Sequence, residues 1–518
     1  MAVTTRRNFL ESVGCGMLFT GLGAGLAADL GCRSVLAAGG KEGDSLAFGK
    51  YDGLVDLMQD TPAEKLQAVL VEKLNRGETD LKNLIAAGAL ANAETFGGED
   101  YVGFHTAMAM LPALQMTQLL PSDRQPLPIL KVLYRNTDQI QKYGGASKKT
   151  LREIHALEEA TVDNVDIAIR DACRKADVAR GEKLFTRMAG ASLDDAFNAL
   201  QPVMQDDINV HRFVFAYRTR GLAELLGQDH AYTILRQCVR FCTSHEQGRI
   251  NNNRPGSPIR GLMPKLLDQH KLAGKTPGTR DPGDEAVEKL ARTIYNGPPE
   301  RSAEAVAAVI AEGWSLEVVG EAISLASNLL VLRQGPDQWR THGDSPGVHS
   351  SDATNAWRNM ARVAKPVHGI TGLIVAAYHV AVHTPFKNDP YPTAEHRALV
   401  KATDQEGLLA EAEEAVRKND QGRAAAAIAM YGEKGGSPQP VYQRMLKYTV
   451  SEDGRLHGEK YFQTVEEEYR TTRPAFRWRQ MVGLARVTAS AYGYDRQDKQ
   501  GSRAPGYEEA CRLLKVSV

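Results

Sequence analysis

The sequence has no excess of charge of either sign, because 63 lysine and arginine residues balance 63 aspartate and glutamate residues. It has no basic tract and, beyond its first forty residues, no apolar run long enough to cross a bilayer. These absences argue against nucleic acid and anionic membrane surfaces as partners, and against a stable membrane anchor.

Several enzyme motifs are also missing. There is no phosphate loop of the Gly-x-x-x-x-Gly-Lys-Ser/Thr type, no strand-bound Gly-x-Gly-x-x-Gly and no Gly-x-Ser-x-Gly elbow. ATP-driven chemistry, Rossmann cofactors and serine hydrolysis are therefore disfavoured.

Cysteine is scarce, with six residues in a chain of 518. Four of them lie beyond residue 37, which is too few for a disulfide framework in so long a chain. Cys238, Cys242 and His245 share one helix face, so they could hold a soft metal. Their apolar neighbours favour the alternative of buried, inert thiols.

What the sequence does have begins at its N-terminus. Thr5-Arg6-Arg7-Asn8-Phe9-Leu10-Glu11 precedes a weakly apolar stretch from Val13 to Ala28, and small residues follow at Val35-Leu36-Ala37-Ala38. This order resembles a twin-arginine export signal, with Glu11 in place of the usual lysine. We expect residues 1–37 to be removed, export by the twin-arginine machinery, and a periplasmic or extracellular location. The alternative is a chance Arg-Arg pair at the front of a frayed helix.

The rest of the chain shows helical periodicity in segment after segment, and no run of alternating β-branched residues. The predicted fold class is all-α. Thr61-Pro62-Ala63-Glu64, Ser192-Leu193-Asp194-Asp195 and Thr403-Asp404-Gln405-Glu406 each predict a helix start. Residues 246–284, rich in Pro, Gly and Asn, predict a linking loop between a helical half at 38–245 and a second at 285–518. Residues 334–348 predict a further break.

Each half contains two similar units, in which two helices lead through a short loop to a histidine and a third helix. The copies of this junction are Gly103-Phe104-His105, Asn209-Val210-His211, Gly347-Val348-His349 and Arg455-Leu456-His457. Similar units usually stack and share a core. The predicted architecture is therefore a set of repeated helical units around a His-lined pocket. Chance alignment of Ala- and Leu-rich helices is the alternative.

A second group of histidines lies on one predicted helix, from about Val367 to Thr384. His368, His379 and His383 share a face, because offsets of eleven and fifteen residues turn about 20° and 60° past whole turns. His379 and His383 are four residues apart, a spacing that lets two imidazoles reach one metal. We predict these three as ligands of a transition metal or a haem.

His105, His211, His349 and Asp352 are the predicted catalytic residues. If the units converge, the first three histidines reach one centre, and Asp352 lies three residues after His349 on the same helix. An acid there could orient the ring or transfer a proton. Ordinary helix N-terminal chemistry is the alternative for Asp352.

The stretch with His349, Asp352, Thr354, Asn355 and Ala356, followed by His368, resembles the questin oxidase family, and the general likeness spans about residues 60–490. That resemblance implies an all-helical, His-rich protein and Baeyer–Villiger-type oxygen insertion into aromatic polyketides. No family site carries over residue by residue, and an export signal departs from the intracellular members of the family.

The sequence as a whole favours an exported oxidoreductase that acts on a small organic substrate through a His-rich metal or haem pocket. Two alternatives stay open. One is a non-enzymatic helical-repeat scaffold whose histidines satisfy core hydrogen bonds. The other is a cofactor-independent enzyme that uses His and Asp.

Overall fold

The computed structural model describes residues 45–154, 162–335, 345–383, 385–493 and 503–518. The described residues form α-helices and short 3₁₀ turns with no β-strand, which confirms the predicted all-α class. The twin-arginine-like segment lies outside the described residues. None of the described helices is both long and apolar enough to span a membrane.

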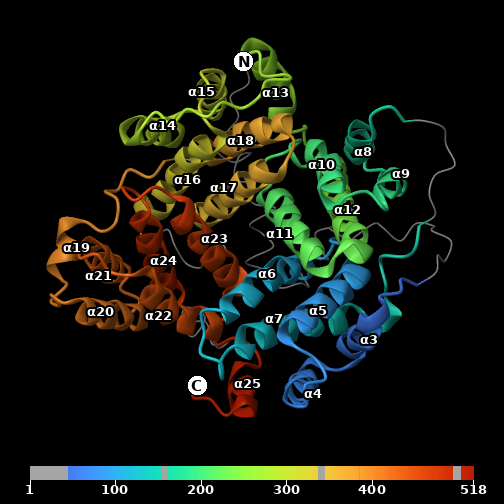
Figure 1. Ribbon diagram of the computed structural model, residues 1–518, viewed down its shortest axis with the longest axis horizontal. Coiled ribbons are helices and arrows are strands. Elements are labelled where there is room, and N and C mark those ends of the chain that lie inside the picture. The colour runs from blue at the N-terminus through green and yellow to red at the C-terminus, as the bar shows by residue number, and fades with distance from the viewer. Residues whose placement is uncertain (1–44, 155–161, 336–344, 384, 494–502) are drawn as a thin grey trace.

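The helices follow one another in four groups around the middle of the molecule (Figure 1). The first group contains α3 (Asp52–Asp60), α4 (Ala63–Asn75), α5 (Leu81–Phe96), α6 (Tyr101–Thr117) and α7 (Pro126–Tyr143). The second contains α8 (Val165–Arg174), α9 (Val178–Phe185), α10 (Leu193–Met204), α11 (Val210–Leu226) and α12 (Gln228–Asn251).

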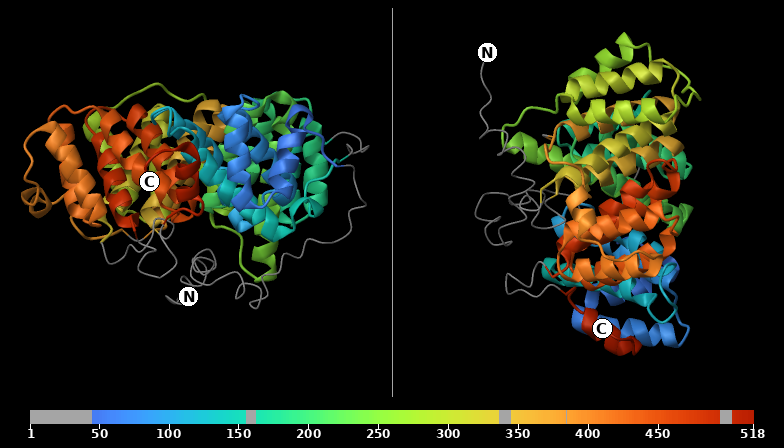
Figure 2. Two further views of the ribbon diagram at one scale, coloured as in Figure 1. Left: turned by 90° about the horizontal axis from the view of Figure 1, so that it is seen from below. Right: turned by 90° about the vertical axis from the view of Figure 1, so that its left-hand side faces the viewer.

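The third group contains α13 (Ile259–Gln269), α14 (Asp284–Asn296), α15 (Pro299–Ala311), α16 (Leu316–Arg333), α17 (Pro346–Val363) and α18 (Pro366–Ala381). The fourth contains α19 (Ala394–Ala398), α20 (Gln405–Arg417), α21 (Gln421–Glu433), α22 (Pro438–Ser451), α23 (His457–Thr471) and α24 (Trp478–Ala491). The last helix, α25 (Tyr507–Leu514), packs against α4 and α7, so the end of the chain returns to its first group (Figures 1 and 2).

The predicted helix starts are found within one residue, although the capping differs in detail. Ser192 caps α10 as expected, since its hydroxyl accepts from the Asp195 amide. Asp404 rather than Thr403 caps α20, and α4 starts after Pro62 without a side-chain cap. Local sequence thus places the helices well, because capping depends on neighbouring residues alone.

The prediction of a loop over residues 246–284 is wrong in part. Helix α12 continues to Asn251, and α13 occupies Ile259–Gln269. Pro258 precedes the first turn of α13, where a missing N–H costs nothing. Ile259 and Leu266 are buried in the main core, and this packing outweighs the helix-breaking composition around them. Helix α17 begins at Pro346, within the break predicted at 334–348, and Ser345 caps it. Residues 336–344 of that prediction lie outside the described residues.

One hydrophobic core runs through all four groups. Helix α18 is buried at every position from Gly369 to Ala381, and α5 and α16 are buried over most of their lengths. Helices enclosed in this way carry few charges, so the polar side chains that they do bury need a specific reason for being there.

Candidate functional site

Four helices form a closed circuit at the centre of the molecule: α6 contacts α11, α11 contacts α17, α17 contacts α23, and α23 contacts α6 (Figure 1). Each carries one junction histidine within its first two turns. We call His105, His211, His349 and His457 the histidine cluster.

The rings of the histidine cluster are near neighbours around this circuit. Ring centroids lie 4.8 Å apart for His105 and His211, 5.9 Å for His211 and His349, 5.4 Å for His349 and His457, and 5.3 Å for His457 and His105. Four residues from four separate stretches of sequence therefore meet at one place.

Caps fix the starts of three of these helices. The Asp100 carboxylate accepts from the Gly103 amide at 2.7 Å, Asn209 Oδ1 accepts from the His211 amide at 2.9 Å, and Ser345 Oγ accepts from the Val348 amide at 3.3 Å. Helix α23 differs, because Arg455 and Leu456 before it adopt left-handed conformations with φ of 50° and 60°. Each start is thus set within a few residues of its histidine.

Two glycines let the histidine-bearing helices approach their neighbours. A Cβ at Gly103 would lie 2.6 Å from the Phe96 ring, and one at Gly347 would lie 2.6 Å from the backbone nitrogen of Val331 on α16. Each glycine precedes its histidine by two positions. The Gly-x-His pattern of these two junctions therefore has a steric reason: close packing against the preceding helix.

Backbone contacts orient the cluster rings. His105 Nδ1 donates to the Tyr101 carbonyl at 2.7 Å, and His457 Nδ1 donates to the Gly454 carbonyl at 3.2 Å. A carbonyl only accepts, so Nδ1 carries the proton and Nε2 of the neutral ring is an acceptor. The Nε2 atoms of His105, His211 and His457 are buried and have no hydrogen-bond partner among the described residues.

The cluster imidazoles are neutral. Burial lowers the pKa of each ring, to about 3 for His349 and well below the ordinary value for the other three. The charge of the Lys460 ammonium lowers the pKa of all four further. Neutral rings with free Nε2 lone pairs are the form of histidine that binds metals.

Lys460 and Asp352 accompany the cluster. Both are buried, and burial lowers the pKa of Lys460 to about 8 and raises that of Asp352 to about 6. Each partly offsets the shift of the other, and Thr464 Oγ1 donates to Asp352 Oδ1 at 2.8 Å. Two proton-exchanging groups with pKa values on either side of 7 thus lie beside four neutral imidazoles.

Sequence reasoning did not single out Lys460, and it recognised His457 as a junction but left it out of the site. A signal was present, because Lys460 follows His457 by three positions as Asp352 follows His349. That spacing puts both groups one turn along their helices, on the side of the histidine.

The predicted trio on α18 is divided. His379 and His383 have ring centroids 5.5 Å apart. His368 is a half-buried residue at the start of the helix, and eleven residues of helix rise place it about 16 Å from His379 along the axis. One metal ion cannot bridge that distance, so His368 cannot join the other two as a ligand.

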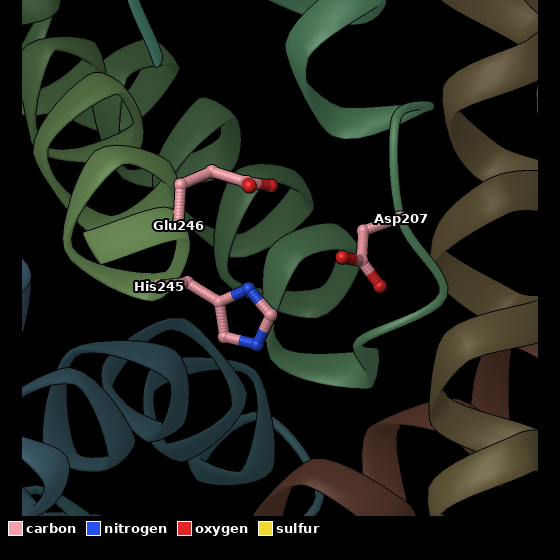
Figure 3. Close-up of side chains that lie close together, drawn as sticks. All are labelled: Asp207, His245 and Glu246. Carbon is pink, nitrogen blue, oxygen red and sulfur yellow. The ribbon is translucent and has the colours of Figure 1, made fainter. Parts of the chain in front are cut away.

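Asp207, His245 and Glu246 are the described residues that bring three ligand atoms within 4.8 Å of one another (Figure 3). Arginines already compensate their charge: Glu246 pairs with Arg212 at 2.8 Å, with Arg249 at 2.7 Å and with Arg260. Burial alone would raise the pKa of Glu246, but the arginines hold it at about 2. This group is therefore a poor site for a cation.

The thiols near His245 fit the alternative of inert cysteines. Cys238 and Cys242 are buried, and burial raises the pKa of Cys238 to about 12. The Asn209 amide contacts His245 Nε2 at 3.0 Å. Protonated thiols offer little to a soft metal, and His245 Nδ1, buried without a hydrogen-bond partner among the described residues, is left as a single imidazole ligand.

Comparison of the chain with family models, with curated proteins and with solved structures finds no match. The likeness to questin oxidases therefore rests on the residues quoted above, and function must be argued from the site itself.

Proposed function

We propose that the protein is an exported oxidoreductase in which the histidine cluster holds a transition-metal ion. The observation that carries the proposal is the convergence of four neutral imidazoles whose Nε2 atoms, in three cases, are buried without a partner. A buried polar atom without a partner is costly, and a metal ion would satisfy these atoms together.

The surroundings of the rings support a metal ion rather than a set of core hydrogen bonds. Metal-binding histidines usually donate their second N–H to a carbonyl or carboxylate, which fixes the tautomer, and His105 and His457 do so. Four imidazoles suit iron, copper, nickel or zinc. Because no three cluster nitrogens lie within 4.8 Å of one another, side-chain rotations must accompany binding.

Lys460 and Asp352 supply the acid–base chemistry of the proposed reaction. Lys460 Nζ and the Asp352 carboxyl group exchange the protons of the reaction, each with a pKa within about one unit of neutrality. A first-row metal at the cluster would supply Lewis acidity or electron transfer.

The substrate class is a small organic molecule, and aromatic compounds fit best. Tyr101 and Phe104 flank the cluster, with ring centroids 4.3 and 4.8 Å from that of His105. Aromatic walls favour aromatic ligands through offset or edge contacts. The resemblance to questin oxidases points to the same class. The repeated units around a His-lined pocket, and export to the periplasm or beyond, belong to this proposal too.

A cofactor-independent enzyme is the second candidate, and Lys460 favours it. A buried ammonium that acts on all four imidazoles opposes the entry of another cation. In that case His349 and Asp352 would work as general base and acid without metal. A scaffold role draws support from the carbonyl contacts of His105 and His457, but it leaves their free Nε2 atoms unexplained.

Metal analysis of residues 38–518, purified after native export, tests the proposal. We expect at least one equivalent of a first-row metal, lost in His105→Ala and His349→Ala. His368→Ala is the matched control, because it removes a histidine outside the cluster, and it should retain the metal. A metal-free, colourless protein that oxidises no aromatic substrate would overturn the metal-dependent function. Metal-free turnover that Asp352→Asn abolishes would establish the second candidate.

A further inference from the structure

We infer that a second divalent metal ion binds at His379 and His383, beside the histidine cluster, so that the centre holds two ions. The inference deepens the proposed function and rests on it for its chemistry. Sequence spacing alone pointed to a shared metal site on this helix, but the structure shows which two histidines belong to it and what lies next to them.

The pair has the properties of metal ligands. His379 Nδ1 donates to the Ile208 carbonyl at 2.8 Å, so the proton is on Nδ1 and Nε2 is the acceptor. The Nε2 atoms of both His379 and His383 are buried without a hydrogen-bond partner among the described residues. The side chain of His379 is only 5% exposed, which leaves water a poor substitute for a ligand.

The pair adjoins the histidine cluster through His349. His379 and His349 both lower the pKa of His383, and His379 also acts on His349. Helices α17 and α18, which carry these rings, pack against each other. The pair therefore lies on the helix next to the one that carries His349 of the cluster.

The charges around His379 and His383 also favour a cation there over the histidine cluster. Burial lowers the pKa of His379 to about 4 and that of His383 to about 3, so both rings are neutral. Asp207, which pairs with Arg260 at 4.0 Å, acts on His379 as a negative charge, whereas the charge acting on the histidine cluster is that of Lys460. A second ion thus meets less repulsion than the first.

Two imidazoles leave coordination positions of the second ion open. His211, His349 and His383 are partly exposed, whereas His105, His379 and His457 are at most 5% exposed. His383 is thus the more accessible member of the pair. We assign the open positions to the oxygen of a hydroxyl- or phenolate-bearing substrate.

Cobalt(II) titration of the metal-stripped full chain tests the inference, because bound cobalt(II) reports its ligands through visible absorption. We expect two equivalents to bind. The double variant His379→Asn/His383→Asn should bind one, and His105→Ala should lose the other. Asn is chosen at 379 because its amide can still donate to the Ile208 carbonyl. His368→Asn on the same helix is the control and should bind two.

Each result has a distinct meaning. One equivalent that the double variant retains overturns the second site and leaves the proposed function standing. One equivalent that only the double variant loses supports this site and overturns the cluster as the first. No bound cobalt(II) overturns both. If the double variant fails to fold by circular dichroism, His383→Asn alone, at the less buried position, gives the same readout.

Discussion

His105 and His457 lie with their ring centroids 5.3 Å apart, although one belongs to the first group of helices and the other to the last. The contact between α6 and α23 brings the first and last groups together. The site is thus a property of the complete fold. A fragment that contains one or two groups would carry only one or two of the four cluster histidines.

Removal of the Lys460 charge should strengthen metal binding at the cluster. Lys460 has a pKa of about 8, so at pH 7 it must release a proton before a cation can enter at low cost. That release costs about 1.4 kcal/mol per pKa unit, or about tenfold in affinity. We expect Lys460→Met to bind metal about tenfold more tightly at pH 7, measured by competition with a chelator.

The advantage of Lys460→Met should vanish by pH 9, because the wild-type lysine is neutral there. Lys365→Met, which changes an exposed lysine just before α18, is the control and should leave the affinity unchanged at both pH values. A tighter complex of Lys460→Met at pH 9 as well as at pH 7 would contradict the role assigned to the Lys460 proton.

The buried histidines should make the metal-free protein sensitive to acid. Their folded-state pKa values lie below the unfolded value of about 6.5, so between these values the unfolded chain binds protons that the folded chain does not bind. Stability is therefore present above pH 6.5 and is lost as the pH falls toward 4. Each histidine contributes up to about 1.4 kcal/mol per pH unit in this window.

Urea unfolding at pH 7 and pH 5.5 measures this effect. His379→Gln should reduce the difference in unfolding free energy between the two pH values by about 1.4 kcal/mol. His230→Gln changes a histidine that is much less buried and should reduce it far less. Asp352 works in the opposite direction, since its raised pKa costs stability as the pH rises from about 4 to about 6. An equal pH dependence of the unfolding free energy in the wild type, His379→Gln and His230→Gln would contradict the assigned protonation states.

Glu246 should contribute to the free energy of unfolding but not to metal binding. Glu246→Gln leaves the buried Arg212 guanidinium without its charged partner, and breaking such a pair costs about 3–5 kcal/mol. Glu414→Gln breaks the pairs of an exposed carboxylate with Lys418 and Arg423 and should destabilise the fold far less. Unfolding in urea gives both values. Loss of bound metal from folded Glu246→Gln would show that Asp207, His245 and Glu246 are ligands after all.

Two helix caps offer a matched test of positioning. Asp100 caps α6 five residues before His105, whereas Asp404 caps the exposed start of α20, a helix that carries no cluster histidine. Either change to Ala should cost about 1 kcal/mol of stability. Only Asp100→Ala should also weaken metal binding, by about tenfold, as loss of an orienting contact around a metal ligand does. Equal affinities of the two variants would contradict the positioning role.

The sequence predicts the helices and the four junction histidines, because both depend on residues close together in the chain. The periodicity of α5 or α16 and the caps at Ser192 and Asp404 are local features. Helix α13 was missed because two buried side chains, Ile259 and Leu266, outweigh a composition typical of loops. That balance is set by the packing of α13 against α15 and α18, which the sequence does not display.

The assembly of the site could be predicted only in outline. The predicted repeat puts His105, His211 and His349 at equivalent positions, but the distances between them depend on how four helices cross. Helical phase grouped His368 with His379 and ignored the rise along the axis, which divides them. The sequence does not indicate Lys460 as a site residue, because a lysine side chain is usually exposed. Lys460 is buried where α6, α11, α17 and α23 pack together.

A crystal structure of the metal-loaded protein, with anomalous difference density recorded at the absorption edge of the bound metal, tests the central claim most directly. The account predicts a peak about 2.0–2.2 Å from Nε2 atoms of His105, His211, His349 and His457. A peak at Asp207, His245 and Glu246 instead, or none at the cluster in crystals soaked with zinc, would contradict it.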